Sequence, residues 1–227
     1  MEKIAVIVAG GSGIRMGTAM PKQFLLLNNK PILLYTLQTF FAAFDDIQVI
    51  LVLPATHLEP GHEIIQSLPK NQRIRLVAGG NTRFHSVQAG LASIPFKTDA
   101  IIFVHDAVRC LLSTKLIQQC YYQAIEKGSA IPAIQASDSI RQFKNGQSLP
   151  VNRDEIYLIQ TPQTFQSKIL LTAFQIPYCD AFTDEATVVE HSGTSIHLIE
   201  GEHQNIKITR PIDLLIAEKF LEDPSLF

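Results

Sequence analysis

Short apolar segments rich in β-branched residues recur along this chain and alternate with segments of helical periodicity. The apolar segments are Ile4–Val8, Ile47–Leu53, Ile74–Val77 and Ile101–Val104. Nearly continuous apolar runs, in place of strict apolar–polar alternation, are typical of strands buried on both faces. Because these runs alternate with helical segments, the sequence predicts an α/β fold with a mainly parallel central sheet covered by helices on both faces.

The helical segments have recognisable apolar faces and ends. From Pro31 onward, apolar residues at 33, 37, 40, 41 and 44 form one face of an amphipathic helix. Other helices are expected at Thr82–Ile94, from Ser113 as the N-cap to Gly128, and from Pro211 to Leu221, and later strands at Ser195–Ile199 and Ile206–Ile208. No internal repeat or low-complexity linker is present, so residues 1–227 are expected to form a single domain.

The overall charge and the cysteines exclude several classes of protein. The 227 residues carry 19 Lys+Arg and 21 Asp+Glu, a formal net charge of −2, which argues against bulk binding to nucleic acid or to a membrane surface. Any cations that bind an anionic ligand must therefore be gathered locally. Cys110, Cys120 and Cys179 have no C-x-x-C spacing and form neither a zinc frame nor a complete disulfide framework.

The N-terminal apolar run, Ile4–Ala9, is too short for the core of a signal peptide. No apolar run in the chain approaches the roughly 18 residues of a membrane span. We therefore expect a cytoplasmic protein.

One polar segment, Ser137–Arg153, interrupts the alternation of strands and helices. It has Asn145-Gly146 at its middle and alternates on either side of that pair, which predicts a β-hairpin with a type I′ turn at about 137–154. An isolated two-stranded hairpin is only marginally stable in water. The hairpin must therefore either fold back onto its own sheet or serve as an arm that grips a second subunit, and its residues alone do not decide between the two.

A glycine-rich segment, Ala9–Gly17, directly follows the first strand. Ligands of open α/β sheets bind beyond the carboxyl ends of the strands, where glycines let backbone N–H groups approach phosphate oxygens. The segment does not match a Walker A loop, and Met16 stands where a dinucleotide fingerprint requires its third glycine. Arg15 and Lys22 flank the turn and suit a triphosphate. The alternatives are a simple tight turn and, for Lys22, a solvated surface lysine.

Three further groups of polar residues are candidates for the site. Asp106 follows the fourth strand, where it could hold Mg²⁺ together with substrate phosphates, although it could also cap a helix or pair with Arg109. Thr183 is expected to cap a helix whose first turn is acidic. Lys207 falls inside an expected strand, an unusual place for a cation unless an anion lies nearby.

No Ser-His-Asp order, pair of glycosidase carboxylates or reactive cysteine stands out. A nucleophile that is already a phosphate anion at neutral pH needs no general base. Such a site requires positioning, cations and a metal ion, which are the features described above.

Taken together, these motifs resemble the 2-C-methyl-D-erythritol 4-phosphate cytidylyltransferase family over essentially the whole chain. The matching blocks are Ala9–Met16, Pro21–Phe24, Gly79–Arg83 with Ser86, His105–Arg109, Asp138–Arg141, Thr161–Phe165, Thr183–Ala186 and Asn205–Pro211. The sequence departs from the family where Cys110 replaces a proline and Ser139 replaces a threonine but keeps the hydroxyl. Neither departure removes a group that the chemistry needs.

The resemblance implies a Rossmann-like nucleotidyltransferase that transfers CMP from CTP to methylerythritol phosphate and releases pyrophosphate, with Mg²⁺ or another divalent cation. It implies that Arg15 and Lys22 stabilise charge on the α-phosphate and that Asp106 faces the metal and the phosphates. It also implies a homodimer, in which the hairpin arm carries Arg153 to the partner's acceptor site. By the same resemblance, nucleotide-binding residues are Ala9, Gly10, Gly11, Ser12, Gly13, Gly80, Asn81, Ser86 and Asp106, and residues that position the acceptor are Arg109, Ser139, Arg153, Thr183 and Lys207.

Two other functions are weighed against this one. A ribitol-5-phosphate cytidylyltransferase performs the same chemistry on another polyol phosphate, but Thr183–Ala186 and Arg210 favour methylerythritol phosphate. A nicotinamide-dependent oxidoreductase is a more remote alternative, because the dinucleotide fingerprint fails.

Overall fold

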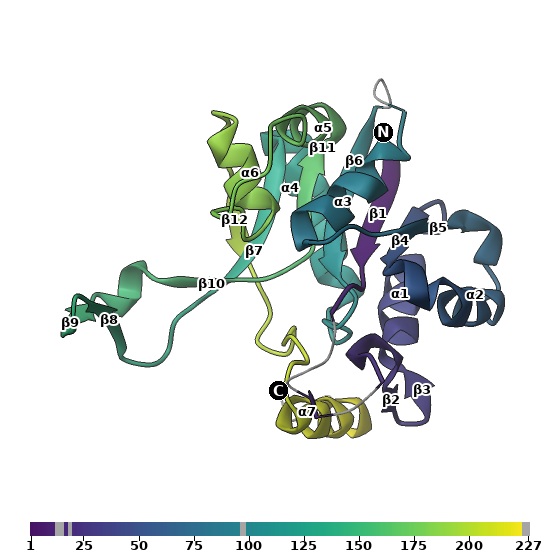
Figure 1. Ribbon diagram of the computed structural model, residues 1–227, viewed down its shortest axis with the longest axis horizontal. Coiled ribbons are helices and arrows are strands. Elements are labelled where there is room, and N and C mark those ends of the chain that lie inside the picture. The colour runs from purple at the N-terminus through teal and green to yellow at the C-terminus, as the bar shows by residue number, and fades with distance from the viewer. Residues whose placement is uncertain (12–15, 18–19, 96–98, 224–227) are drawn as a thin grey trace.

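The computed structural model describes residues 1–11, 16–17, 20–95 and 99–223. Its centre is an eight-stranded sheet (Figure 1) with the order β10–β7–β11–β6–β1–β4–β5, to which β12 adds by pairing with β7. The strands of this sheet are β1 (Glu2–Val8), β4 (Gln48–Leu53), β5 (Ile74–Ala78), β6 (Ala100–Asp106), β7 (Ser129–Gln135), β10 (Tyr157–Ile159), β11 (Gln163–Gln166) and β12 (Leu198–Glu200).

The sheet is mainly parallel, as the sequence predicts. β6, β1, β4 and β5 pair in parallel, and so do β12 and β7. β11 runs antiparallel between β6 and β7, and β10 pairs antiparallel with β7. β7, β10 and β11 are not predicted from the sequence: β7 carries Pro132 inside its apolar run, and β10 and β11 are only three and four residues long.

Helices cover both faces of the sheet, because residues that alternate along the buried strands point to opposite sides. Ala5 and Ile7 of β1 belong to a core shared with α1, α2 and α4, whereas Ile4 and Val6 belong to a core shared with α3, α5 and α6. The helices are α1 (Ile32–Ala43), α2 (Leu58–Gln66), α3 (Arg83–Ala92), α4 (Thr114–Lys127), α5 (Ser167–Ala173), α6 (Glu185–His191) and α7 (Pro211–Glu222).

A third core lies beyond the carboxyl ends of the strands, where α7 packs near the small hairpin of β2 (Leu26–Leu27) and β3 (Lys30–Pro31) (Figure 1). Leu27, Val108, Ile208 and Ala217 are buried in it. This packing places the chain around residue 208 directly over the end of the sheet.

Most helix ends lie where the sequence predicts them. The Ser113 hydroxyl accepts a hydrogen bond from the Leu116 N–H at the start of α4, and Gly128 ends that helix. The strand expected at 206–208 is wrong: this segment has no strand pairing, and a backbone bond from the Ile208 N–H to the Val108 carbonyl tethers it. Its alternating side chains face the third core on one side and the end of the sheet on the other, which gives a strand-like pattern without a neighbouring strand.

The polar segment forms the predicted hairpin. β8 (Ile140–Lys144) and β9 (Gln147–Val151) pair only with each other, and Asn145 and Gly146 have φ of 52° and 76°, as a type I′ turn requires. The hairpin projects away from the sheet as an arm (Figure 1), so it does not fold back onto its own sheet. None of the described helices is long and apolar enough to cross a membrane.

Candidate active site

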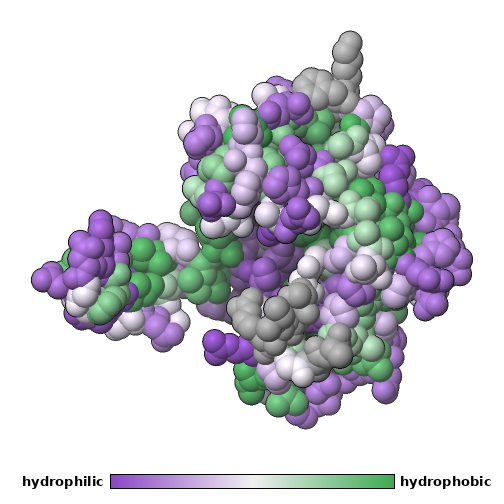
Figure 2. Space-filling model, in the orientation of Figure 1, coloured by the Kyte–Doolittle hydropathy of each residue, from purple (hydrophilic) through white to green (hydrophobic). Residues whose placement is uncertain are grey.

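A cavity of about 260 Å³ opens at the carboxyl ends of the parallel strands. Figure 2 shows hydrophilic side chains in a recess between the body of the sheet and the region of α7. The predicted residues that line the cavity are Ala9, Gly10, Gly11, Lys22, Gly80, Asn81, Ser86, Asp106 and Lys207. A larger open hollow, of about 660 Å³, lies at the opposite ends of β1 and β4 and contains none of the predicted site residues.

One wall of the cavity is the turn that joins β5 to α3. Thr82 caps α3 by accepting a hydrogen bond from the His85 N–H, and the Ser86 hydroxyl lies within hydrogen-bond distance of the carbonyls of Gly80 (3.3 Å) and Thr82 (2.9 Å). Gly80 packs so tightly on His85 that an added Cβ would lie 2.5 Å from the His85 Cβ. The turn is therefore fixed by its own contacts and presents backbone groups to the cavity.

Lys22 is a buried residue and not a solvated surface lysine. Only 8% of it is exposed, and its Nζ donates to the Ile208 carbonyl at 3.0 Å. Its Cε lies 2.8 Å from the place where a Cβ on Gly11 would stand. The ammonium group is therefore held beside the glycine turn, as a cation that contacts a triphosphate must be.

Asp106 is the acidic side chain that lines this cavity, and two cations hold it. Arg83 Nε lies 3.2 Å from Oδ1 and Lys207 Nζ lies 2.7 Å from Oδ2. Burial alone would raise the pKa of Asp106, but Arg83 and Lys207 outweigh burial and keep this pKa below its usual range. Asp106 is thus the anion that the position of Lys207 in the sequence suggested. Of the alternatives considered for Asp106, neither a helix cap nor a pair with Arg109 is observed in the described part of the chain, since its carboxylate pairs with Arg83 and Lys207.

Arg109 lies behind the cavity, at the start of the loop that follows β6. Its Nη1 donates to the Asn205 carbonyl at 2.7 Å, and its Nε is buried without a partner among the described residues. Burial lowers the pKa of Arg109, and the nearby negative charge of Asp106 offsets this only in part. Next to it, burial lowers the pKa of His105 to about 3, so this ring is neutral and bonds to Thr161 and to the Arg109 carbonyl.

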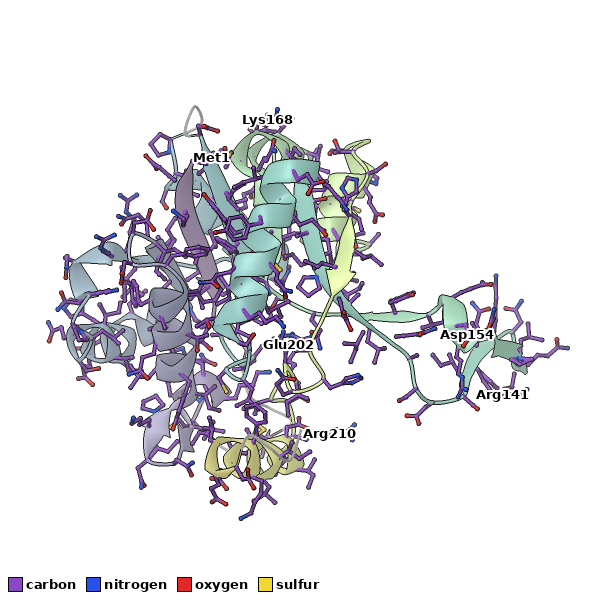
Figure 3. All side chains as sticks on the ribbon, turned by 180° about the vertical axis from the view of Figure 1, so that it is seen from behind. Met1, Arg141, Asp154, Lys168, Glu202 and Arg210 are labelled. Atoms are coloured by element: carbon purple, nitrogen blue, oxygen red, sulfur yellow. The ribbon has the colours of Figure 1, made fainter. Side chains whose placement is uncertain are left out.

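The other acceptor-site residues do not reach this cavity. Ser139 and Arg153 lie on the arm, where Arg153 Nη1 donates to the Ser137 carbonyl, and Figure 3 shows the labelled arm residues Arg141 and Asp154 far from the rest of the chain. Thr183 precedes α6 but does not cap it. Asp184 is the cap, because its carboxylate accepts from the Thr187 N–H at 2.9 Å and is itself fixed by Gln163.

The predictions on Ser12, Gly13 and Arg15 lie outside the described residues. The structure adds residues to which the sequence assigned no role. Arg83 and Glu185 belong to matching blocks and form a buried ion pair, and Gln23 lines the cavity with both amide atoms buried and unpartnered among the described residues. The presence of these residues in the matching blocks could have marked them as site residues. The pairing of Arg83 with Glu185 could not be predicted in the same way, because the two residues are 102 positions apart in the sequence.

The described residues contain no cluster of three or more His, Cys, Asp or Glu side chains that could hold a metal ion. Asp106 offers a single carboxylate whose two oxygens already contact cations. This donor set fits an ion bound mainly through substrate phosphates, with Asp106 facing it, because Mg²⁺ is commonly held by one or two carboxylates together with phosphates.

A Rossmann-like sheet whose strand ends present glycines, three cations and one carboxylate around a single cavity is the arrangement of a nucleotidyltransferase. The pattern of the 2-C-methyl-D-erythritol 4-phosphate cytidylyltransferase family matches residues 3–223. The chain belongs to this family, which confirms the resemblance, the enzyme class and the fold class expected from the sequence.

Individual proteins agree with this assignment. The 2-C-methyl-D-erythritol 4-phosphate cytidylyltransferase of Phocaeicola vulgatus is 41% identical over 218 residues, which cover 96% of this chain and 99% of that protein. That of Azobacteroides pseudotrichonymphae is 42% identical over 222 residues, 97% of this chain and 99% of the relative. The crystal structure of the Francisella tularensis enzyme has a TM-score of 0.80 at 31% identity and covers 96% of this chain and 99% of its own. These comparisons favour neither the ribitol-5-phosphate nor the oxidoreductase alternative.

The contact between Gly80 and His85 generates a prediction for the nucleotide site. In Gly80→Ala the new methyl group displaces the first turn of α3, so we expect a KM for CTP raised about ten-fold and a lower melting temperature, since overpacking typically costs ~1–3 kcal/mol. Gly10→Ala is the matched control for folding: among the described residues its Cβ would meet only Ser86 Oγ, at 4.0 Å, so the melting temperature should stay unchanged. An unchanged KM in Gly80→Ala would contradict the role of this turn.

Proposed function

We propose that this chain transfers CMP from CTP to the phosphate of 2-C-methyl-D-erythritol 4-phosphate, giving 4-diphosphocytidyl-2-C-methyl-D-erythritol and pyrophosphate, in non-mevalonate isoprenoid biosynthesis. The observation that carries the proposal is the gathering of Lys22, Arg83 and Lys207 around one cavity of a chain whose net charge is −2. Two anionic substrates must approach each other in this reaction, and such a local excess of cations lowers their mutual repulsion.

The reaction requires little acid–base chemistry from the protein. The acceptor phosphate is already an anion at neutral pH, so it attacks the α-phosphorus of CTP directly, forms the new P–O bond, and displaces pyrophosphate. Lys22, with Arg15, stabilises the charge on the five-coordinate α-phosphate. The glycine turn at 9–13 binds the triphosphate, while Gly80, Asn81 and Ser86 recognise the cytosine.

On the acceptor side, Lys207, Arg109 and Thr183 position methylerythritol phosphate. Arg109, held by the Asn205 carbonyl just behind the cavity, is placed so that its positive charge can act on the acceptor phosphate. Mg²⁺, held mainly by the triphosphate and faced by Asp106, supplies neutralisation of phosphate charge when bound. We place the reaction in the cytoplasm, because the cysteines are unpaired and both substrates are phosphorylated metabolites.

The arm supports a homodimer with shared sites. Phe143 and Leu149 of the hairpin are 75% and 50% exposed, and β8 and β9 have no other strand to pair with among the described residues. A hairpin of this kind gains stability by packing on another surface. We assign that surface to a second copy of the chain, whose acceptor site then receives Ser139 and Arg153 in trans.

The choice of acceptor is tested by pyrophosphate release with CTP and each of two polyol phosphates in parallel. We expect rapid release with methylerythritol phosphate and little with ribitol 5-phosphate, because the Thr183–Ala186 block and Arg210 match the former. Reactions without an acceptor control for CTP hydrolysis. Faster release with ribitol 5-phosphate would overturn the proposed substrate.

The role of Lys22 is tested by Lys22→Ala. Loss of a preorganised cation at the transition state should lower kcat by about 10²–10³-fold and change the affinity for CTP less. The matched control is Lys30→Ala, which removes an exposed lysine nearby and should leave kcat unchanged. A near-normal kcat in Lys22→Ala would remove this residue from the mechanism.

The shared site is tested by mixing inactive subunits. In a dimer of one Lys22→Ala and one Arg153→Ala subunit, one site keeps both residues, so mixing should restore about one working site per mixed dimer. A mixture of Lys22→Ala and Lys207→Ala subunits is the control and should restore nothing, because both residues lie in the cavity of the same subunit. No restoration in the first mixture, with mixed dimers present, would place Arg153 in its own subunit's site.

A further inference from the structure

Glu185 is a buried carboxylate that the proposed chemistry does not use. It is the first residue of α6, is 1% exposed, and faces Arg83 of α3. Arg83 Nη1 and Nη2 donate to its two carboxylate oxygens, Nη2 at 3.0 Å. A buried carboxylate is costly unless it is paired in this way, so the position of Glu185 depends on Arg83 and that of Arg83 on Glu185.

The residues on either side of Glu185 are both bound by one side chain. Gln163 of β11 donates through Nε2 to Asp184 Oδ2 at 2.9 Å and accepts through Oε1 from the Ala186 N–H at 2.8 Å. Because β11 lies inside the sheet, Glu185 is anchored to the same rigid layer as Asp106. This anchoring is more than the capping of a short helix requires.

The third donor of the same guanidinium connects Glu185 to the cavity. Arg83 Nε contacts Asp106 Oδ1, which leaves Oδ2 to hold the Lys207 ammonium at 2.7 Å. In this four-residue network two cations and two carboxylates alternate as Glu185–Arg83–Asp106–Lys207. Without the charge of Glu185, Asp106 is the one carboxylate among the described residues that Arg83 still pairs with, and the guanidinium then competes with Lys207 for both oxygens.

We propose that Glu185 is a positioning residue for the transfer reaction. It holds Arg83 so that only one oxygen of Asp106 is taken, and Lys207 is thereby kept at the other oxygen, directed toward the cavity. The expected effect of Glu185 on turnover rests on the proposed function. Its expected effect on the position of Lys207 rests on the geometry alone.

The first test is a double-mutant cycle on kcat/KM for the acceptor. Glu185→Gln should lower this ratio about ten-fold or more, whereas adding Glu185→Gln to an Arg83→Gln enzyme should cause no further loss, because residues that act through one contact are not additive. Glu185→Asp keeps the charge and should recover part of the activity. Glu202→Gln is the control, since it removes a part-buried carboxylate that accepts hydrogen bonds from Ser113, the N-cap of α4, and should leave kcat/KM unchanged.

The second test needs no turnover. Acetic anhydride modification of Lys207, measured by peptide mass spectrometry relative to the exposed Lys127, should rise several-fold in Glu185→Gln, because Lys207 loses its place on Asp106. The rise should be absent in the Glu185→Gln/Arg83→Gln variant, in which no guanidinium competes for Asp106. A general loosening of α6 would increase the modification in both variants and would overturn the proposal.

The two hypotheses fail in different ways. If the wild-type enzyme does not transfer CMP to either polyol phosphate, the proposed function is wrong, and the Lys207 modification still decides the role of Glu185. If the wild type is active but Glu185→Gln lowers kcat/KM equally in the presence and absence of Arg83, the positioning role is wrong. Thermal unfolding of each variant identifies any that is not folded, and Glu185→Asp then replaces Glu185→Gln in both tests.

Discussion

A buried carboxylate, Asp106, is shared by two cations from distant parts of the chain, and the geometry of the cavity depends on that sharing. Asp106 ends β6, Arg83 begins α3, and Lys207 lies in the segment that crosses the end of the sheet. A charge buried this deeply is costly unless it is paired and hydrogen-bonded. The two pairs therefore keep Asp106 ionised and hold three segments together around the cavity.

The same arrangement explains how a slightly acidic protein can receive two anionic substrates. Its net charge of −2 gives no general attraction for phosphates, but the cavity is lined by Lys22, Arg83 and Lys207 against the single carboxylate of Asp106. Within a partly enclosed site these charges act at short range and are weakly screened. The positive charge that the cavity offers thus comes from the placement of a few cations in a chain whose overall charge is nearly balanced.

The sequence predicted most of the residues that line the cavity. Its predictions failed where two neighbouring residues, or two kinds of local structure, fitted the same pattern equally well. Thr183 and Asp184 are both good N-cap residues, and Asp184 caps α6 because Gln163, from a strand that the sequence pattern did not reveal, binds its carboxylate. The segment 206–208 alternates like a strand, but it passes beyond the sheet and finds no strand to pair with. The type I′ hairpin was predicted correctly, since its turn is set by two adjacent residues, while its projection from the body was indicated by the family resemblance and not by the residues alone.

The sequence by itself determined the elements whose causes are local: the buried parallel strands, the capped helices and the Asn145-Gly146 turn. Each depends on the periodicity or backbone preference of a few neighbouring residues, which any reader of the chain can see. Only the tertiary structure decided that Arg83 pairs with Glu185 across 102 residues and that Lys207 meets Asp106. Such pairs depend on which strands become neighbours and how closely the helices pack on them, and these relations are set by the whole core at once.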